Sequence, residues 1–187
     1  MAAGSAALPA ISRMARAQTY PTRPVHIIVA FTAGGTSDIV ARLIGQWLSE
    51  RLGQQFVVEN RPGAGGNIGA EAVVRAAPDG YTLLVASNAN AANATLYDKL
   101  NFDFIGDIAP VASLIRVPNV VEVHPSVPVT TLPELIAYAK ANPGKINMAS
   151  AGNGTSQHIA GELFKMMTGL NMLHVPYRGS GPALTDL

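Results

Sequence analysis

The chain has 187 residues, of which 48% are hydrophobic and 13% are charged, and its formal net charge is +1. This composition predicts a globular protein and excludes the strong positive field with which proteins attract nucleic acid. The absence of cysteine excludes disulfides, thiolate metal sites and cysteine nucleophiles, and it is compatible with both the cytoplasm and the periplasm.

The first residues have features of an export signal. A short apolar stretch, Ala2 to Ala10, precedes the small-x-small cleavage pattern Ala15-Arg16-Ala17. The basic segment that normally precedes such a stretch is missing, so we interpret residues 1–19 as a signal-peptide remnant. We therefore expect export to the periplasm, with a disordered alanine-rich tail as the alternative.

The first predicted unit is a strand, a glycine-rich turn and a helix. Val25 to Phe31 is a β-branched apolar run, typical of a buried strand, and it ends at Thr32-Ala33-Gly34-Gly35. Apolar residues then recur at helical spacing from Ile39 to Leu48. Ser37 is the expected N-cap of this helix and Gly53 its expected left-handed stop.

The same pattern returns further along the chain. Phe56 to Glu59 predicts a second strand, Arg61 to Gly66 a loop, and Asn67 to Ala77 a second helix, which is followed by a third strand from Tyr81 to Ala86. Strands that alternate with helices at this spacing predict parallel βαβ units with helices on both faces of a sheet. Loops at the carboxyl ends of such strands are the usual ligand sites.

A change of pattern predicts a second domain. The interrupted apolar stretch from Val111 to Val123 contains Pro118, and we place domain I at residues 20–118 and domain II at residues 119–187. The predicted elements of domain II are a helix opened by the capping box Thr131–Glu134, a strand from Ile146 to Ser150, a helix from Ser156 to Thr168 and a strand from Leu173 to Val175. The sequence ends inside the start of a further helix, so we expect domain II, and the return to domain I, to be incomplete.

Two strand, glycine-rich turn and helix units carry the strongest functional signal, at residues 33–38 and residues 150–156. Free backbone amides at a helix N-terminus, with the positive end of the helix dipole behind them, can bind an anion without lysine or arginine. Either loop alone is usually ordinary turn chemistry. Their pairing across two domains predicts a site for a small carboxylate.

Individual side chains near these loops each have two interpretations. Asp38 either complements the helix dipole or selects ligands by charge, and Ser87-Asn88 either line the cleft or cap a helix. His158 either faces the ligand or lies on an ordinary helix surface, and Arg178 either reaches a carboxylate or is a solvated loop residue. The candidate ligand-binding residues are Gly34, Gly35, Thr36, Ser37, Asp38, Ser87, Asn88, Ser150, Gly154, Thr155, Ser156, His158 and Arg178.

Other chemistries are poorly supported. The four histidines do not occur at a metal-ligand spacing such as His-x-x-x-His, and the chain has neither a Gly-x-Ser-x-Gly elbow nor a P-loop. The segment from Gly63 to Gly69 superficially resembles a dinucleotide fingerprint, but Ile68 replaces its third glycine. We therefore expect no catalytic residue, metal or cofactor, and a dinucleotide-binding oxidoreductase is the weaker, enzymatic alternative.

Several motifs together resemble the Bordetella uptake gene (Bug) or TctC-type family, the extracytoplasmic receptors of tripartite tricarboxylate transporters. The resemblance runs through Ala33–Asp38, Val58–Gly66, Pro78–Leu83, Ser150–His158 and His174–Gly179. It implies an α/β, periplasmic-binding-protein-like fold of two domains that close on a carboxylate, with the glycine-rich loops gripping it from opposite walls.

The resemblance also implies partners. The ligand would be a di- or tricarboxylate, an acidic amino acid or an aromatic acid, and it would be delivered by a monomer to the membrane components of the transporter. Family members continue well beyond position 187, and Arg178 stands where many have lysine. A non-functional fragment or a carboxylate sensor domain is the alternative.

Overall fold

The computed structural model describes residues 19–187. The predicted signal remnant, residues 1–19, thus lies outside the described residues except for Thr19. Among the helices of residues 19–187, none has the length and apolar character needed to cross a membrane.

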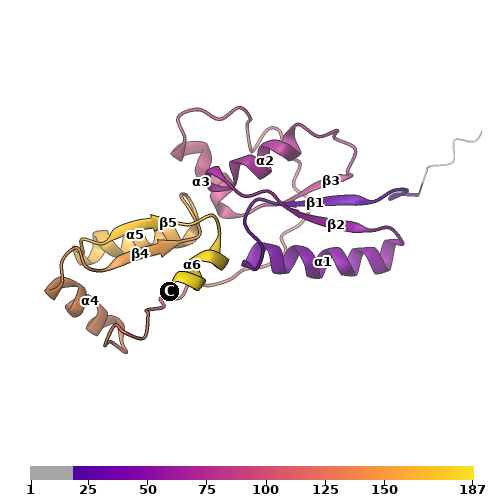
Figure 1. Ribbon diagram of the computed structural model, residues 1–187. Coiled ribbons are helices and arrows are strands. Elements are labelled where there is room, and N and C mark those ends of the chain that lie inside the picture. The colour runs from indigo at the N-terminus through magenta and orange to yellow at the C-terminus, as the bar shows by residue number, and fades with distance from the viewer. Residues whose placement is uncertain (1–18) are drawn as a thin grey trace, which may run out of the picture.

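The first half of the described chain is a parallel sheet with helices on both faces (Figure 1). Its strands are parallel, as predicted for consecutive βαβ units, and their order is β2-β1-β3. We call residues 19–96 the N-terminal lobe. Its elements are β1 (Val25–Val29), α1 (Thr36–Leu52), β2 (Phe56–Asn60), the 3₁₀ turn η1 (Ala64–Gly66), α2 (Asn67–Val74), β3 (Thr82–Val85) and α3 (Asn88–Leu96).

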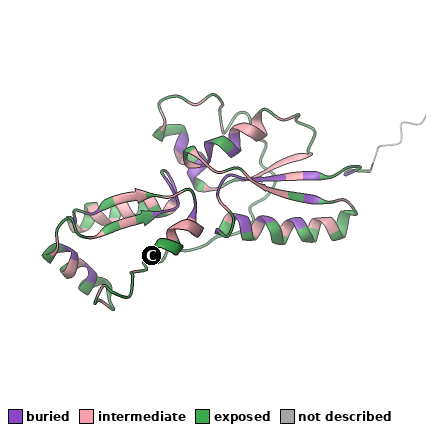
Figure 2. Ribbon diagram, viewed as in Figure 1, coloured by how far each residue is buried: buried purple, intermediate pink, exposed green. Residues whose placement is uncertain are grey.

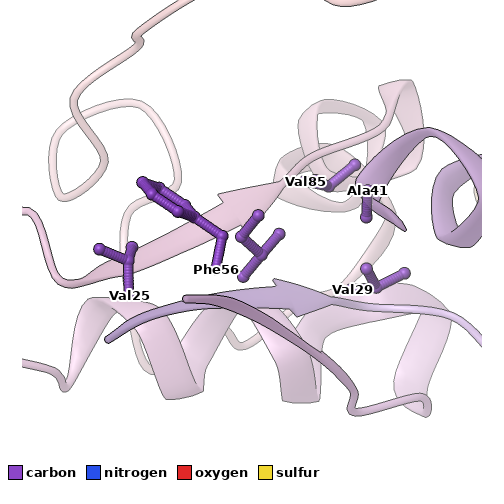
Figure 3. Close-up of a cluster of buried hydrophobic side chains, with 6 residues drawn as sticks. Val25, Val29, Ala41, Phe56 and Val85 are labelled. Atoms are coloured by element: carbon purple, nitrogen blue, oxygen red, sulfur yellow. The ribbon is translucent and has the colours of Figure 1, made fainter. Parts of the chain in front are cut away.

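The core of this lobe is built around its central strand, β1. Val25 and Val29 are fully buried, and in the register of the sheet they lie beside Phe56 and Val85. The same cluster includes Ala41 from α1 (Figure 3). A central parallel strand is covered on both faces, which explains why its sequence is an almost continuous apolar run.

The second half of the described chain forms a smaller unit around two parallel strands. We call residues 132–187 the C-terminal lobe. Its elements are α4 (Leu132–Ala141), β4 (Asn147–Ser150), α5 (Ser156–Thr168), β5 (Leu173–Pro176) and α6 (Ser180–Asp186). Residues 97–131, between the lobes, contain neither helix nor strand. The expected domain boundary after residue 118 falls in this segment and stays a prediction.

Apolar side chains are unusually exposed in two places. One is α5, in which no residue is buried and Ile159, Leu163, Met166 and Met167 are 49–76% exposed (Figure 2). The other is the segment between the lobes, where Val111 is 88% exposed. Contiguous exposed apolar surface of this kind usually contacts another chain segment or a partner.

The structure corrects two local predictions. Ser37 does not cap α1: the N-cap is Gly35, and Ser37 is the second helical residue. The helix α3 was not predicted, because its sequence has many asparagines and alanines and little apolar periodicity. Its N-cap is Ser87, whose side chain forms a capping box with Asn90.

Two glycines, one in α2 and one in α1, lie close to the sheet, and replacing each by alanine tests how tightly the helices pack there. A Cβ on Gly69 would lie 2.8 Å from Cα of Ala30, whereas a Cβ on Gly45 of α1 would lie 3.3 Å from the carbonyl oxygen of Phe56. We predict that Gly69→Ala lowers the free energy of unfolding by about 1–3 kcal/mol, because the backbone at Ala30, directly after β1, must move.

Gly45→Ala serves as the matched control, since the gain in helix propensity of about 1 kcal/mol offsets a milder clash. Urea unfolding followed by circular dichroism measures both variants. Equal stabilities of the two variants would contradict the packing argument.

Candidate functional site

The loop after β1 is held by the carboxylate of Asp38. This side chain is 3% exposed and accepts a hydrogen bond of 2.9 Å from the amide of Gly34. It also accepts two hydrogen bonds, of 3.0 and 2.8 Å, from the guanidinium of Arg42, and one of 2.9 Å from Nδ2 of Asn60. The hydrogen bonds from Arg42 are the main cause that lowers the pKa of Asp38 to about 2. Asp38 is therefore ionised and fully engaged within its own lobe.

This network changes which amides of the first loop can bind a ligand. The amide of Gly34, which we expected to point outward unpaired, already donates to Asp38. Within the described residues, no side chain caps α1, because its N-cap is Gly35. The amides of Thr36 and Ser37, at the positive end of a 17-residue helix, are among those left for an anion.

The loop after β4 is built in the same way. Gly154 has a positive φ of 78°, as Gly34 has one of 83°, and its amide donates to Nδ1 of His158 at 3.1 Å. In both loops the acceptor is thus the third residue of the following helix, four positions after the glycine. The amide of Gly154, like that of Gly34, is therefore not free for a ligand.

Other predicted residues of this loop serve its internal structure. Thr155 is the N-cap of α5 and donates through its hydroxyl to the carbonyl of Gly152 at 2.7 Å. Ser150 is 2% exposed, and its hydroxyl lies 2.6 Å from Nε2 of His174. Ser156 donates to Oδ1 of Asn119 at 3.2 Å, which ties the start of α5 to the segment between the lobes.

A cleft of about 340 Å³ lies between the two lobes. Residues 62–66 of the N-terminal lobe and residues 151–153 of the C-terminal lobe contribute to its walls, together with Phe31, Tyr97 and Arg178. Of the predicted site residues, Arg178 alone is among the lining residues within the described chain. It is also the only charged residue among them.

The segment that follows β5 connects this cleft to both predicted loops. The amide of Tyr177 donates to the carbonyl of Ser150 at 3.0 Å, and the amide of Thr32 donates to the carbonyl of Arg178 at 3.2 Å. A Cβ on Gly35 would lie 3.9 Å from the backbone nitrogen of Ser180. The two loops therefore do not face each other directly, and residues 177–180 lie between them.

The turn at residues 63–66 was missed as a site element. All four residues have positive φ, including Ala64 at 47°, a conformation that costs an alanine about 1–2 kcal/mol. Gly65 allows a close contact between the lobes, because a Cβ there would lie 2.8 Å from the carbonyl oxygen of Asn153. Backbone strain of this kind is concentrated at functional sites. The sequence signal was the glycine-rich segment itself, which we considered only as a failed dinucleotide fingerprint.

Ser87 and Asn88 serve capping and helix formation rather than the cleft. Ser87 accepts a hydrogen bond from the amide of Ala89, and Asn88 is the exposed first residue of α3. Neither residue lines the cleft. Of the two interpretations left open by the sequence, the structure favours capping.

One cluster has the composition of a metal site. Single ligand atoms of His158, Glu162 and His174 lie within 4.8 Å of one another. The two imidazole rings are stacked, however, with centroids 4.1 Å apart and planes 16° apart. Their in-plane lone pairs run nearly parallel and cannot both point at one ion about 2.1 Å away. The arrangement therefore does not fit a metal ion.

Comparisons with known proteins agree on one family. Residues 40–187 match the model of the tripartite tricarboxylate transporter family receptor. Protein BugT of Bordetella pertussis is 41% identical over 173 residues, which are 91% of this chain and 53% of BugT. The chain spans about half the length of the curated relatives it matches.

Two solved structures extend this similarity to ligand-bound proteins. Rpa4515 of R. palustris, solved with adipate, is 43% identical, with a TM-score of 0.87 over 90% of this chain and 56% of that protein. MatC of Rhodopseudomonas palustris, solved with bound malate, is 33% identical, with a TM-score of 0.76 over 90% of this chain and 57% of that protein. Both support an α/β fold like that of periplasmic binding proteins.

The Asp38 network predicts how stability depends on acid. The pKa of Asp38 falls from 3.8 to about 2 on folding, so its contribution is fully present above pH 4 and is lost as the pH falls to 2. We predict that the parent chain loses about 2 kcal/mol more of its unfolding free energy over this range than Asp38→Asn does.

Urea unfolding at a series of pH values measures this difference. Asp98→Asn, at an exposed position just after the N-terminal lobe, is the control and should follow the parent chain. Parallel acid profiles for the parent and Asp38→Asn would show that the Arg42–Asp38 pair does not hold the folded state.

Proposed function

This chain belongs to the tripartite tricarboxylate transporter receptor family, and we propose that it is an exported receptor that binds a small organic carboxylate in the periplasm. In this proposal the ligand is delivered to the membrane components of such a transporter. Members of the family are solute-binding receptors and not enzymes. The dinucleotide-binding oxidoreductase that the sequence left open is therefore wrong.

The observation that carries the proposal is the position of Arg178. Arg178 is exposed and lines the cleft between the lobes, where the described lining residues include no carboxylate. A charge-assisted hydrogen bond from arginine contributes about 1.5–3 kcal/mol, and the planar guanidinium matches a carboxylate. Arg178 also belongs to the segment of residues 177–180 that touches both loops, so a ligand bound there would contact both lobes.

The amides at the start of α1 supply the second part of the proposed site. They are uncapped by any described side chain, and the Asp38 network holds the turn that precedes them. A dicarboxylate could thus place one group on Arg178 and the other at the N-terminus of α1, directly or through water. Adipate and malate, the ligands of the two similar structures, are both dicarboxylates.

The 187-residue chain by itself exposes apolar surface that a continuation of the fold could cover. The apolar residues of α5 and of residues 111–121 resemble the inner surface of a larger fold, and the relatives are about twice as long as the matched region. We propose that tight binding requires a continuation equivalent to theirs, which covers this surface and adds to the contact between the lobes.

We predict that fusing the C-terminal half of BugT after Leu187 raises carboxylate affinity at least tenfold and reduces the fluorescence of a bound hydrophobic dye. The reason is that the fused segment covers the exposed face of α5. Calorimetry with adipate and malate measures the affinity, and an unrelated domain of the same length is the fusion control. Equal affinities for the chain and the BugT fusion would overturn this requirement.

We predict that Arg178→Gln weakens carboxylate binding by about 10- to 100-fold, in the chain and in the fusion, because the cleft loses its only described cation. Thr36→Glu should weaken binding similarly, since the new carboxylate competes for the amides of α1. Calorimetry and ligand-induced shifts of the melting temperature measure both.

The matched controls are Arg51→Gln, which removes an exposed arginine over Trp47 in the last turn of α1, and Thr36→Gln, which adds bulk without charge. Both should bind like the parent. Unchanged affinity in Arg178→Gln would remove the cleft from the proposed site. A loss in Thr36→Gln as large as in Thr36→Glu would remove the electrostatic part of the argument.

A further inference from the structure

Two histidines stand behind the glycine-rich loop of the C-terminal lobe. His158 is in the first turn of α5 and His174 is on β5, and their rings stack with centroids 4.1 Å apart. The side chain of His158 is 19% exposed, and neither residue lines the cleft. His158 therefore does not occupy the ligand-contacting position that the sequence suggested as one of its two interpretations.

The hydrogen bond to His158 defines its protonation state. Nδ1 accepts from the amide of Gly154, so Nδ1 must carry a lone pair and the ring hydrogen must be on Nε2. A further proton can only add to Nδ1. That proton would point at the N–H of Gly154, and the hydrogen bond would be lost.

The second ring is tied to the same loop from the other side. Nε2 of His174 lies 2.6 Å from the hydroxyl of Ser150, and that hydroxyl accepts a hydrogen bond of 3.2 Å from the amide of Gly152. The nearest carboxylate, that of Glu162, is 3.9 Å from Nε2 of His158, and it is paired with Lys165 at 2.7 Å. The carboxylate of Glu162 is thus already paired with a cation, and two stacked imidazolium ions would repel each other.

We propose that His158 is a positioning residue that holds the loop of residues 150–155 in its folded shape only while its ring is uncharged, with the ring of His174 stacked against it. The loop is then assembled at neutral pH and released in acid. Asp38 holds the corresponding glycine of the N-terminal lobe with a group that stays ionised down to about pH 2. The two lobes therefore use the same geometry, but the loop of the C-terminal lobe responds to pH between 5 and 8 and that of the N-terminal lobe does not. Any consequence for ligand binding rests on the proposed function.

The environment of His174 supports the direction of this effect. Burial is the main cause that lowers its pKa, and the neighbouring His158 lowers it further. A histidine whose pKa is lowered on folding binds a proton more readily when unfolded. Its contribution to stability is therefore complete above the ordinary histidine pKa of about 6.5 and is lost as the pH falls below it.

Nuclear magnetic resonance of the ¹⁵N-labelled chain tests the proposal without any ligand. At pH 8 the ring of His158 should be the Nε2–H tautomer. Between pH 8 and 5 the amide of Gly154 should shift with the midpoint of the His158 ring and lose about tenfold of its protection against hydrogen exchange, corrected for intrinsic rates. The amide of Gly34 should keep its protection over the same range and serves as the internal control.

Two variants separate a positioning role from general acid sensitivity. His158→Asn places an uncharged acceptor oxygen near the position of Nδ1, so the Gly154 amide should keep its protection down to pH 5. His124→Asn, which changes an exposed histidine of the segment between the lobes, should behave like the parent.

An Nδ1–H tautomer of His158 at pH 8, or Gly154 protection that persists through the titration of the ring, would overturn the proposal. So would acid loss of protection in His158→Asn equal to that in the parent. Since none of these readouts requires a carboxylate, a failure of carboxylate binding leaves the test valid. In the BugT fusion, adipate affinity that falls in acid for the parent and not for His158→Asn would connect the two proposals.

Discussion

The rest of the structure depends on a close backbone contact between the lobes at Thr32 and Gly179. The amide of Thr32 donates to the carbonyl of Arg178, and Gly179 has a φ of 152°. A Cβ on Gly179 would overlap the side-chain oxygen of Thr32. Only glycine allows this approach, and the approach places Arg178 in the cleft beside the turn of residues 63–66. The site is thus determined by how closely two backbones can meet, more than by any set of polar side chains.

Two buried oxygens where the lobes meet have no hydrogen-bond partners within residues 19–187, Oγ1 of Thr32 beside Gly179 and Oδ1 of Asn93 beside Gly154. The amide orientation of Asn93 is fixed, because its Nδ2 donates to the carbonyl of Gly65 and to Oδ1 of Asn67. Its Oδ1 faces Gly154 of the other lobe. An unpaired buried acceptor costs about 1–3 kcal/mol, and water would satisfy it if the lobes separated.

The sequence predicted the elements whose signal is local and strong. The apolar run of β1, the capping box of Thr131 and the two glycine-rich loops were all identified at their positions. The helix α3 was missed because tertiary contacts of Asn90 and Asn93, and not an apolar stripe, hold it in place. The role of the turn at residues 63–66 was also missed, since it depends on Asn153 meeting Gly65 across a distance of 88 positions in the chain. Such contacts have no sequence period.

The two loops show how one geometry can serve two purposes. A glycine with φ near 80° turns the chain out of a parallel strand, and the third residue of the next helix accepts its amide proton. When the glycine amide is hydrogen-bonded within the loop, the loop keeps a defined shape before any ligand binds. The amides of the first helical residues then remain free to bind a ligand. Preorganisation of this kind lowers the conformational cost of binding.

The identity of the acceptor then decides the response to pH: a carboxylate held by Arg42 stays charged, whereas an imidazole stacked on a second imidazole must stay neutral. The sequence shows a glycine followed four positions later by a possible acceptor in both loops. The hydrogen bond between the two residues could be seen only in the structure.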